Sequence, residues 1–354
     1  MTVERILLWP GVPLALASAL LFGASTPAAK LLLGEGLSPW LLAGLFYLAS
    51  GLGLGAWTLL RRLGGGRTEA ALARADLPWL ALVVLAGGIA GPVLLMAGLA
   101  ATPAATASLL LNLEGIATLA IAWLVFRENV DRRLLAGAAA ILAGAALLSW
   151  QGGPAGFGPG ALAIAAACLA WGIDNNLTRK LSAADPVQIA AIKGLAAGAV
   201  NTALALGSGA ALPTPAQLAA AGLVGLVGYG ISLVLFVLAL RHLGAARAGA
   251  YFSTAPFVGA ALSVALLGEP ATWQLAAAAL LMAAGLYLHL AERHDHEHRH
   301  EAMAHAHRHV HDAHHRHAHA PGDPPGEPHA HWHRHAPLVH RHPHYPDLHH
   351  RHGH

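Results

Sequence analysis

Long apolar runs separated by short polar or glycine-rich breaks fill the first 290 residues of the chain. A helix that crosses a bilayer needs about 20 apolar residues, because the hydrocarbon core is roughly 30 Å thick. Runs of this length predict ten transmembrane helices. They lie at about residues 12–33, 39–60, 78–100, 104–126, 132–150, 159–179, 186–207, 217–240, 246–267 and 271–290.

The runs are rich in Ala, Leu and Gly without a period of two, so they predict α-helices and not barrel strands. Apolar residues make up 56% of the chain and charged residues only 11%, against about a quarter charged residues in soluble domains. We therefore expect an all-α integral membrane protein whose main partner is the lipid bilayer. Its basic residues form no groove with interleaved aromatics, which argues against a nucleic-acid partner.

The breaks between the runs differ in charge on the two sides of the membrane. Short cytoplasmic loops carry an excess of Lys and Arg. With the N-terminus inside, the opposite-side loops at 34–38, 101–103, 151–158, 208–216 and 268–270 hold none. The cytoplasmic segments hold Arg5, Arg61, Arg62, Arg67, Arg74, Arg127, Arg132, Arg133, Arg179, Lys180, Arg241 and Arg247. We expect a multi-pass protein of the inner (plasma) membrane with both termini in the cytoplasm.

The chain also contains two related halves. Phe22-Gly23 followed by Lys30 corresponds to Trp171-Gly172 followed by Arg179, and Glu128 corresponds to Glu269. Each half holds five runs, so the second half enters the membrane the opposite way round, as in transporters with inverted repeats. The alternative is that Gly/Ala/Leu-rich runs look alike by composition alone. The predicted segments are a cytoplasmic N-terminus at 1–11, repeats at 12–150 and 159–290, a linker at 151–158 and a tail at 291–354.

The run that ends in Phe126-Arg127-Glu128-Asn129-Val130 and continues through Leu134 to Leu148 resembles the closing motif of an EamA domain. That domain is the repeat unit of the drug/metabolite transporter superfamily. The second copy reads Leu267-Gly268-Glu269-Pro270, and Phe22-Gly23 with Lys30 is similar to the family's opening motif. The resemblance implies a ten-helix fold and, usually, export of small metabolites or drugs. Gly115, at the position of Pro256 in the second copy, departs from the pattern.

Glu114 lies near the middle of the run 104–126, too deep for a short carboxylate to reach an interface. An ionisable side chain there costs roughly 2.5–3.5 kcal/mol, so it needs an explanation. We expect a protonatable coupling group, or one that contacts a cation. The alternative is a structural carboxylate paired with Lys30 or Lys193.

Other polar side chains within the runs are candidates for the transport pathway. They are Asn112, Lys30, Asp174, Asn175, Asn176, Lys193 and Asn201. The alternative for the cluster at 174–176 is that it caps a cytoplasmic helix end. The alternative for Lys193 is that its ammonium reaches the inner surface.

The tail from residue 294 holds 23 of the 25 histidines. A flexible run of imidazoles can bind Zn²⁺, Ni²⁺ or Co²⁺. The Pro- and Gly-rich stretch 321–328 argues against a packed domain, so we expect a disordered tail. The candidate ligands are His294, His296, His298, His300, His305, His307, His309, His311, His314, His315, His317 and His319. The alternatives are a pH-responsive polyelectrolyte or a tail without function.

These features predict a secondary transporter, most simply an exporter, of a small molecule or a divalent metal, with no required cofactor and either a monomeric or a homodimeric state. Proton coupling through Glu114 is part of this hypothesis. The alternative from another class is a membrane-anchored metal sensor or buffer. An enzyme is not expected, because the chain has no Ser/His/Asp constellation, nucleotide loop or helical His-Glu-x-x-His motif.

Overall fold

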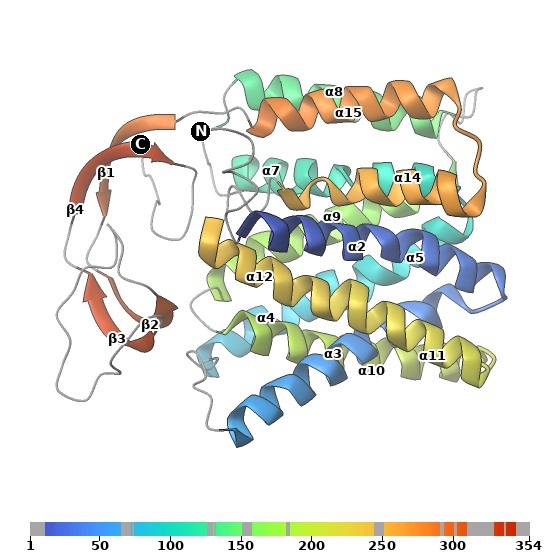
Figure 1. The fold of residues 1–354 in the computed structure, drawn as a ribbon, viewed down its shortest axis with the longest axis horizontal. Helices are drawn as coiled ribbons and strands as arrows, with labels where there is room; N and C mark the ends of the chain where they lie inside the picture. The colour runs from blue at the N-terminus through green and yellow to red at the C-terminus, as the bar shows by residue number, and fades with distance from the viewer. Residues whose placement is uncertain are drawn as a thin grey trace.

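The computed structural model describes residues 11–64, 72, 74–125, 130, 132–150, 158–181, 185–243, 251–290, 294–300, 303–309, 329–335 and 338–344. Up to residue 290 its elements are helices, stacked side by side in one bundle (Figure 1). In the first half they are α2 Gly11–Gly34, α3 Pro39–Leu63, η1 Arg74–Asp76, α4 Leu77–Val83, η2 Val84–Ala90, α5 Gly91–Ala100, α6 Ala104–Leu110, α7 Leu113–Leu124 and α8 Arg132–Ser149. In the second half they are α9 Pro159–Leu181, α10 Pro186–Gly207, α11 Pro215–Val224, η3 Gly225–Ile231, α12 Ser232–Leu243, α14 Ala255–Leu267 and α15 Trp273–Leu290.

All ten predicted runs contain helix, and the prediction of an apolar helical protein is confirmed. Within the described residues, seven helical stretches are long and apolar enough to cross a membrane. The helices α14 and α15 are apolar but shorter, and α9 carries Asp174, Arg179 and Lys180 in its second half. Ten spans therefore stay a prediction. The seven stretches are Gly11–Gly34, Pro39–Leu63, Arg74–Ala100, Ala104–Leu124, Arg132–Ser149, Val187–Gly207 and Pro215–Phe236.

Helix boundaries follow local chemistry. Proline occupies the first turn of α3, α10, α11 and α14, where a missing N–H costs nothing. Thr214 and Gln217 form a reciprocal capping box at the start of α11. Gly268 ends α14 in the left-handed conformation, at φ 66°.

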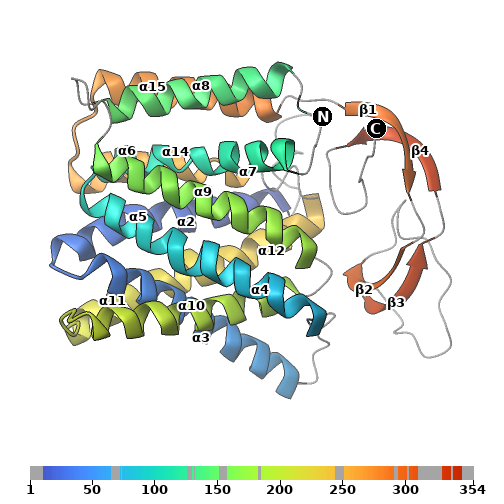
Figure 2. The same cartoon turned by 180° about the vertical axis from the view of Figure 1, so that it is seen from behind.

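Irregularities recur at matching places in the two halves. The π-helical segments η2 and η3 begin at Val84 and Gly225, which are 141 residues apart. The chain also breaks from helix at 111–112, between α6 and α7, and at 253–254, before α14. The packing repeats too, because α9 lies against α5 and α7 just as α2 lies against α12 and α14 (Figure 2). These matches support an internal repeat.

Two pairs of helices, each joining one half to the other, form opposite sides of the bundle: α8 with α15 and α3 with α10 (Figure 1). Glycines bring these helices into backbone contact. A Cβ at Gly137 of α8 would lie 2.7 Å from the Gly285 carbonyl oxygen of α15, and a Cβ at Gly285 2.6 Å from the Gly137 carbonyl oxygen. Such close approach is how membrane helices associate without a hydrophobic driving force.

The tail contains four strands: β1 His294–His300, β2 Met303–His309, β3 His329–His335 and β4 Leu338–His344. The strand β1 pairs antiparallel with β4, and β2 with β3. The prediction of a wholly disordered tail is corrected for these four segments. Histidine at every second residue has the period of a β-strand, whereas the expectation of disorder rested on the Pro- and Gly-rich stretch 321–328.

Candidate translocation site

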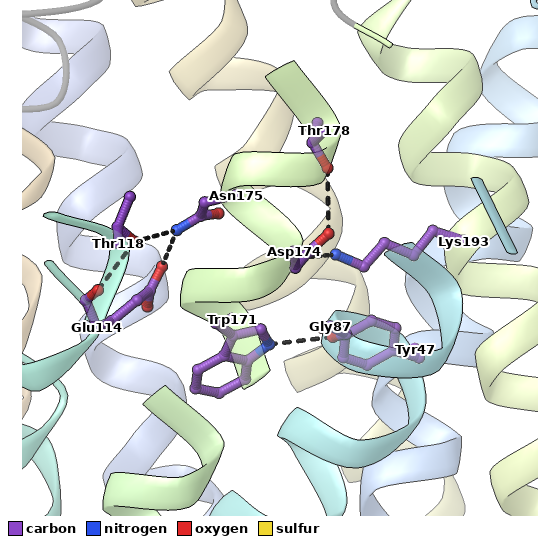
Figure 3. A network of polar contacts seen from close by, with 9 residues as sticks. All are labelled: Tyr47, Gly87, Glu114, Thr118, Trp171, Asp174, Asn175, Thr178 and Lys193. Atoms are coloured by element: carbon purple, nitrogen blue, oxygen red, sulfur yellow. Dashed lines mark hydrogen bonds and ion pairs between the residues drawn. The ribbon is translucent and has the colours of Figure 1, made fainter. Parts of the chain in front are cut away.

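The polar cluster of α9 lies where this helix crosses three others. Successive residues of a helix point about 100° apart, so Asp174, Asn175 and Asn176 face different neighbours. Asn175 contacts α7 and Asp174 contacts α10 (Figure 3). Asn176 donates to the carbonyl oxygen of Thr118 in α7 and to that of Gly172 in its own helix. The structure thus brings together five of the predicted residues: these three, Glu114 and Lys193.

Glu114 lies in the first turn of α7, just after the helix break. Its Oε1 accepts a hydrogen bond from Asn175 Nδ2 at 2.9 Å, and the same amide donates to Thr118 Oγ1 at 3.2 Å. Thr118 in turn donates to the Glu114 carbonyl oxygen at 2.9 Å. Among the side chains that the structure describes, none forms an ion pair with Glu114. The alternative that Glu114 pairs with Lys30 or Lys193 is therefore wrong in this conformation.

Lys193 of α10 pairs instead with Asp174 (Figure 3). Both side chains are well buried, with 18% and 6% of their surface exposed. Thr178 also donates to Asp174 Oδ1 at 3.1 Å. Burying a charge is costly unless it is paired, so the pair neutralises both charges within the bundle. Lys193 is thus used inside the protein and does not reach for the membrane surface.

The π-helix η2 offers carbonyl groups to the same region. The Gly91 N–H bonds to the Ala86 carbonyl oxygen, and Pro92 has no N–H to give to the carbonyl groups before it. The Gly87 carbonyl oxygen accepts from Tyr47 Oη at 2.9 Å and from Trp171 Nε1 at 3.0 Å. Side chains thus replace the backbone donor that the bulge and the proline remove.

Asn201 of α10 performs the same task one residue further along η2. Its Nδ2 donates to the Gly88 carbonyl oxygen at 3.1 Å, and its Oδ1 accepts from Trp40 Nε1 at 3.2 Å. Asn201 is fully buried. It belongs to the scaffold that holds η2 against α10.

Aromatic rings line the region beside η3. Tyr229 contacts Phe22, Phe46 and Tyr47 at centroid distances of 5.6, 5.5 and 5.6 Å. Tyr47 therefore belongs both to the polar network and to this aromatic cluster. The sequence interpretation singled out neither Tyr47 nor Thr118. The Gly87-Gly88 pair followed by Gly91-Pro92 was the available signal, because it marks a helix that bulges and packs closely.

Two predicted pathway residues have other partners. Asn112, at the α6–α7 break, donates to the Leu109 carbonyl oxygen at 2.8 Å and lies against Met282 of α15. Lys30, near the end of α2, donates to the carbonyl oxygens of Leu99 at 2.6 Å and of Thr102 at 2.8 Å. Neither hydrogen-bonds to the network around α9 in the described residues.

The histidines predicted to bind metal divide between two parts of the tail. His294, His296, His298 and His300 lie in β1, and His305, His307 and His309 lie in β2. The remaining five, His311, His314, His315, His317 and His319, are outside the described residues. In the described part of the chain no group of three or more His, Cys, Asp or Glu side chains is arranged to hold a metal. Metal binding by the tail stays a prediction.

Three comparisons place the chain among known proteins. The profile of the EamA-like transporter family matches residues 9–150 and 158–291. An uncharacterized transporter of Methanothermobacter thermautotrophicus strain Delta H is 28% identical over 230 residues, which cover 63% of this chain and 67% of that protein. The crystal structure of another protein aligns with a TM-score of 0.57 at 22% identity, over 78% of this chain and 94% of the other. That last likeness concerns the fold alone.

Proposed function

Because this chain belongs to the EamA-like transporter family, we propose that it is a secondary transporter that carries a small solute between its two halves by alternating access. Ten spans in two inverted sets of five, with both termini in the cytoplasm, complete the proposal. The recurrence of the π-helix at Val84 and Gly225 supports the repeat, and the distribution of Lys and Arg supports the orientation.

The observation that carries the proposal is that Asp174 has an ion-pair partner and Glu114, within the described residues, has none. Asp174 forms an ion pair with Lys193, whereas within the described residues the Glu114 carboxylate accepts a hydrogen bond only from the neutral amide of Asn175 and has no ion-pair partner. A carboxylate without a counter-charge inside an apolar bundle favours binding a proton or a cationic group. Glu114 is thus suited to exchange a proton for a solute.

The polar network and the aromatic cluster that shares Tyr47 with it favour a solute with hydrogen-bond donors and an apolar body. Asn176 Oδ1 is buried and has no hydrogen-bond partner within the described residues, so it offers a free acceptor. Tyr229 and Phe22 supply ring faces, which attract cations and apolar groups. A small organic cation or amine fits both features, and export in exchange for protons is the direction we propose.

We expect Glu114→Gln to abolish proton-coupled flux while the protein still inserts and folds. Glutamine keeps an oxygen that accepts from Asn175, so the local structure survives, but its side chain cannot take up a proton. The measurement is solute-dependent proton movement into proteoliposomes, followed with an internal pH dye against a panel of amines, metabolites and divalent metals.

Glu35→Gln is the matched control, since Glu35 is an exposed carboxylate at the end of α2. It should transport at the wild-type rate. Wild-type coupled flux in the Glu114→Gln protein would eliminate the coupling role of this residue.

The tail motivates a narrower hypothesis, in which a divalent transition metal is the substrate or the regulator. Imidazole-rich segments near the cytoplasmic end would capture metal for export. We expect deletion of residues 294–354 to lower flux at limiting Zn²⁺ or Ni²⁺ and to leave flux at saturating metal unchanged. Unchanged metal tolerance of cells that carry the truncated protein would argue against this hypothesis. Absence of any solute flux would instead favour a membrane-anchored sensor or buffer.

A further inference from the structure

Within the described residues, the apolar core is continuous at one end of the bundle and divided at the other. The continuous end carries the turns at 34–38, 101–103 and 268–272, and we call it the closed end. Figure 1 shows the α2–α3 and α14–α15 connections together at this end. Its core cluster includes Leu37, Leu99 and Leu109 and joins α2, α3, α5, α6 and α9.

Towards the opposite end this single core gives way to two separate clusters. One contains Val12, Ala15 and Ala239 and joins the start of α2 to α12. The other joins α4, the end of α9 and the start of α10, and contains Leu80, Val83, Leu181 and Ile189. The helices α2, α9 and α10 thus share one core cluster towards the closed end, whereas beyond it α2 belongs to one small cluster and α9 and α10 to the other.

The fourth predicted span changes character at its break in the same way. Six of the seven residues of α6 are buried, whereas in α7 only Ala122 is. Glu114 lies immediately past this break. A Cβ added at Gly115 would meet nothing within 4 Å. Among the described residues, the continuous apolar core therefore lies on the closed-end side of this break, and the polar network begins on its other side.

Two charged side chains hold the α5–α6 turn at the closed end. Lys30 of α2 donates to the carbonyl oxygens of Leu99, Ala100 and Thr102, at 2.6, 3.3 and 2.8 Å. The last carbonyl groups of a helix have no partner within it and carry partial negative charge, so an ammonium group stabilises them.

Glu269 holds the other side of the turn. It lies directly after Gly268, the left-handed residue that ends α14. Its Oε1 accepts from the Ala104 N–H at 2.6 Å and its Oε2 from the Ala105 N–H at 2.8 Å, at the start of α6. These amides are unpaired within the helix and favour a carboxylate. The opposite charges of Lys30 and Glu269 also lie close enough to interact.

We propose that Lys30 and Glu269 form a clamp that keeps the closed end shut, and that transport requires its release. The clamp joins α2, through Lys30, and the α14–α15 loop, through Glu269, to the α5–α6 turn. Both side chains bind backbone groups of that turn. Opening this end separates the α5–α6 hairpin from α2 and α14, because α6 packs mainly against these two helices. The inference rests on the proposed function and assigns the gate of the same pathway.

Ser108 provides a reporter for the test. It is fully buried on α6, and a Cβ at Gly259 of α14 would lie 2.6 Å from its hydroxyl oxygen. In a Cys168→Ala background, which removes the sole cysteine of the chain, Ser108→Cys places an isosteric thiol between α6 and α14. Its rate of labelling by a charged maleimide, with the protein in nanodiscs, measures opening of the closed end without any substrate.

We expect Lys30→Met and Glu269→Gln each to raise the labelling rate about tenfold, the change that loss of a charge-assisted hydrogen bond makes in a two-state equilibrium. Lys30→Arg keeps its donors and should label slowly, as should Glu35→Gln at the same end. Equal labelling rates in the parent, Glu269→Gln and Lys30→Met proteins, all monodisperse by size exclusion, would overturn the clamp. Glu269→Gln is isosteric, so its labelling rate alone tests the clamp if the Lys30→Met protein cannot be purified. A faster rate in a protein that moves no solute would support the clamp and count against transport.

Discussion

At the residue scale, the site depends on how charge is distributed between Asp174 and Glu114. Both were identified from the sequence, because a carboxylate inside an apolar run is rare enough to need a reason. Their partners were not identified, because helix contacts decide them. Lys193 was a candidate for the pathway, with the inner surface or a pair with Glu114 as alternatives, and it pairs with Asp174.

The buried pair gives a prediction of its own. Asp174→Asn leaves the Lys193 ammonium without a counter-charge in the bundle, so we expect a loss of about 3–5 kcal/mol in stability. The double change Asp174→Asn with Lys193→Met removes both charges and should recover most of the loss. Thermal unfolding of the detergent-solubilised proteins measures this. A double variant as unstable as the single one would show that the charges themselves matter little.

At the scale of elements, η2 is the feature that the hydrophobic pattern could not reveal. An apolar run predicts a helix, and it is silent on whether that helix contains a π-bulge, because bulge and regular turn have the same composition. The cause is local, since Pro92 cannot donate and the glycines before it let α9 and α10 approach. The boundaries of the runs, in contrast, were predicted to within a few residues, since prolines and glycines mark them.

Gly87 in this bulge is expected to tolerate no side chain. A Cβ there would overlap the Asp174 carboxyl group. We expect Gly87→Ala to cost about 1–3 kcal/mol through displacement of α9 and to impair transport. Gly222→Ala in α11 is the control, since nothing lies within 4 Å of a Cβ at Gly222. Equal thermal stabilities of the two variants would contradict the close packing of η2 against α9.

At the scale of the whole molecule, the sequence predicted the helical architecture but not the conformation, that is, which end of the bundle is closed. The helical class followed from the apolar runs, and the family from the motifs at 126–130 and 267–270. Which end is closed did not follow, because it depends on side-chain contacts between distant segments, such as those that Lys30 makes 69 residues along the chain. Lys30 was predicted to line the pathway, and its contacts put it at the clamp.

The contacts of α8 with α15 and of α3 with α10 have a consequence for how the protein is assembled. The most intimate glycine contacts, Gly137 with Gly285 among them, join one half to the other. Within its own half α8 packs only slightly, against α6 and α7, and its main packing partner is α15 of the other half. The molecule therefore resembles a dimer whose two subunits share a single polypeptide, because each half completes its packing against the other.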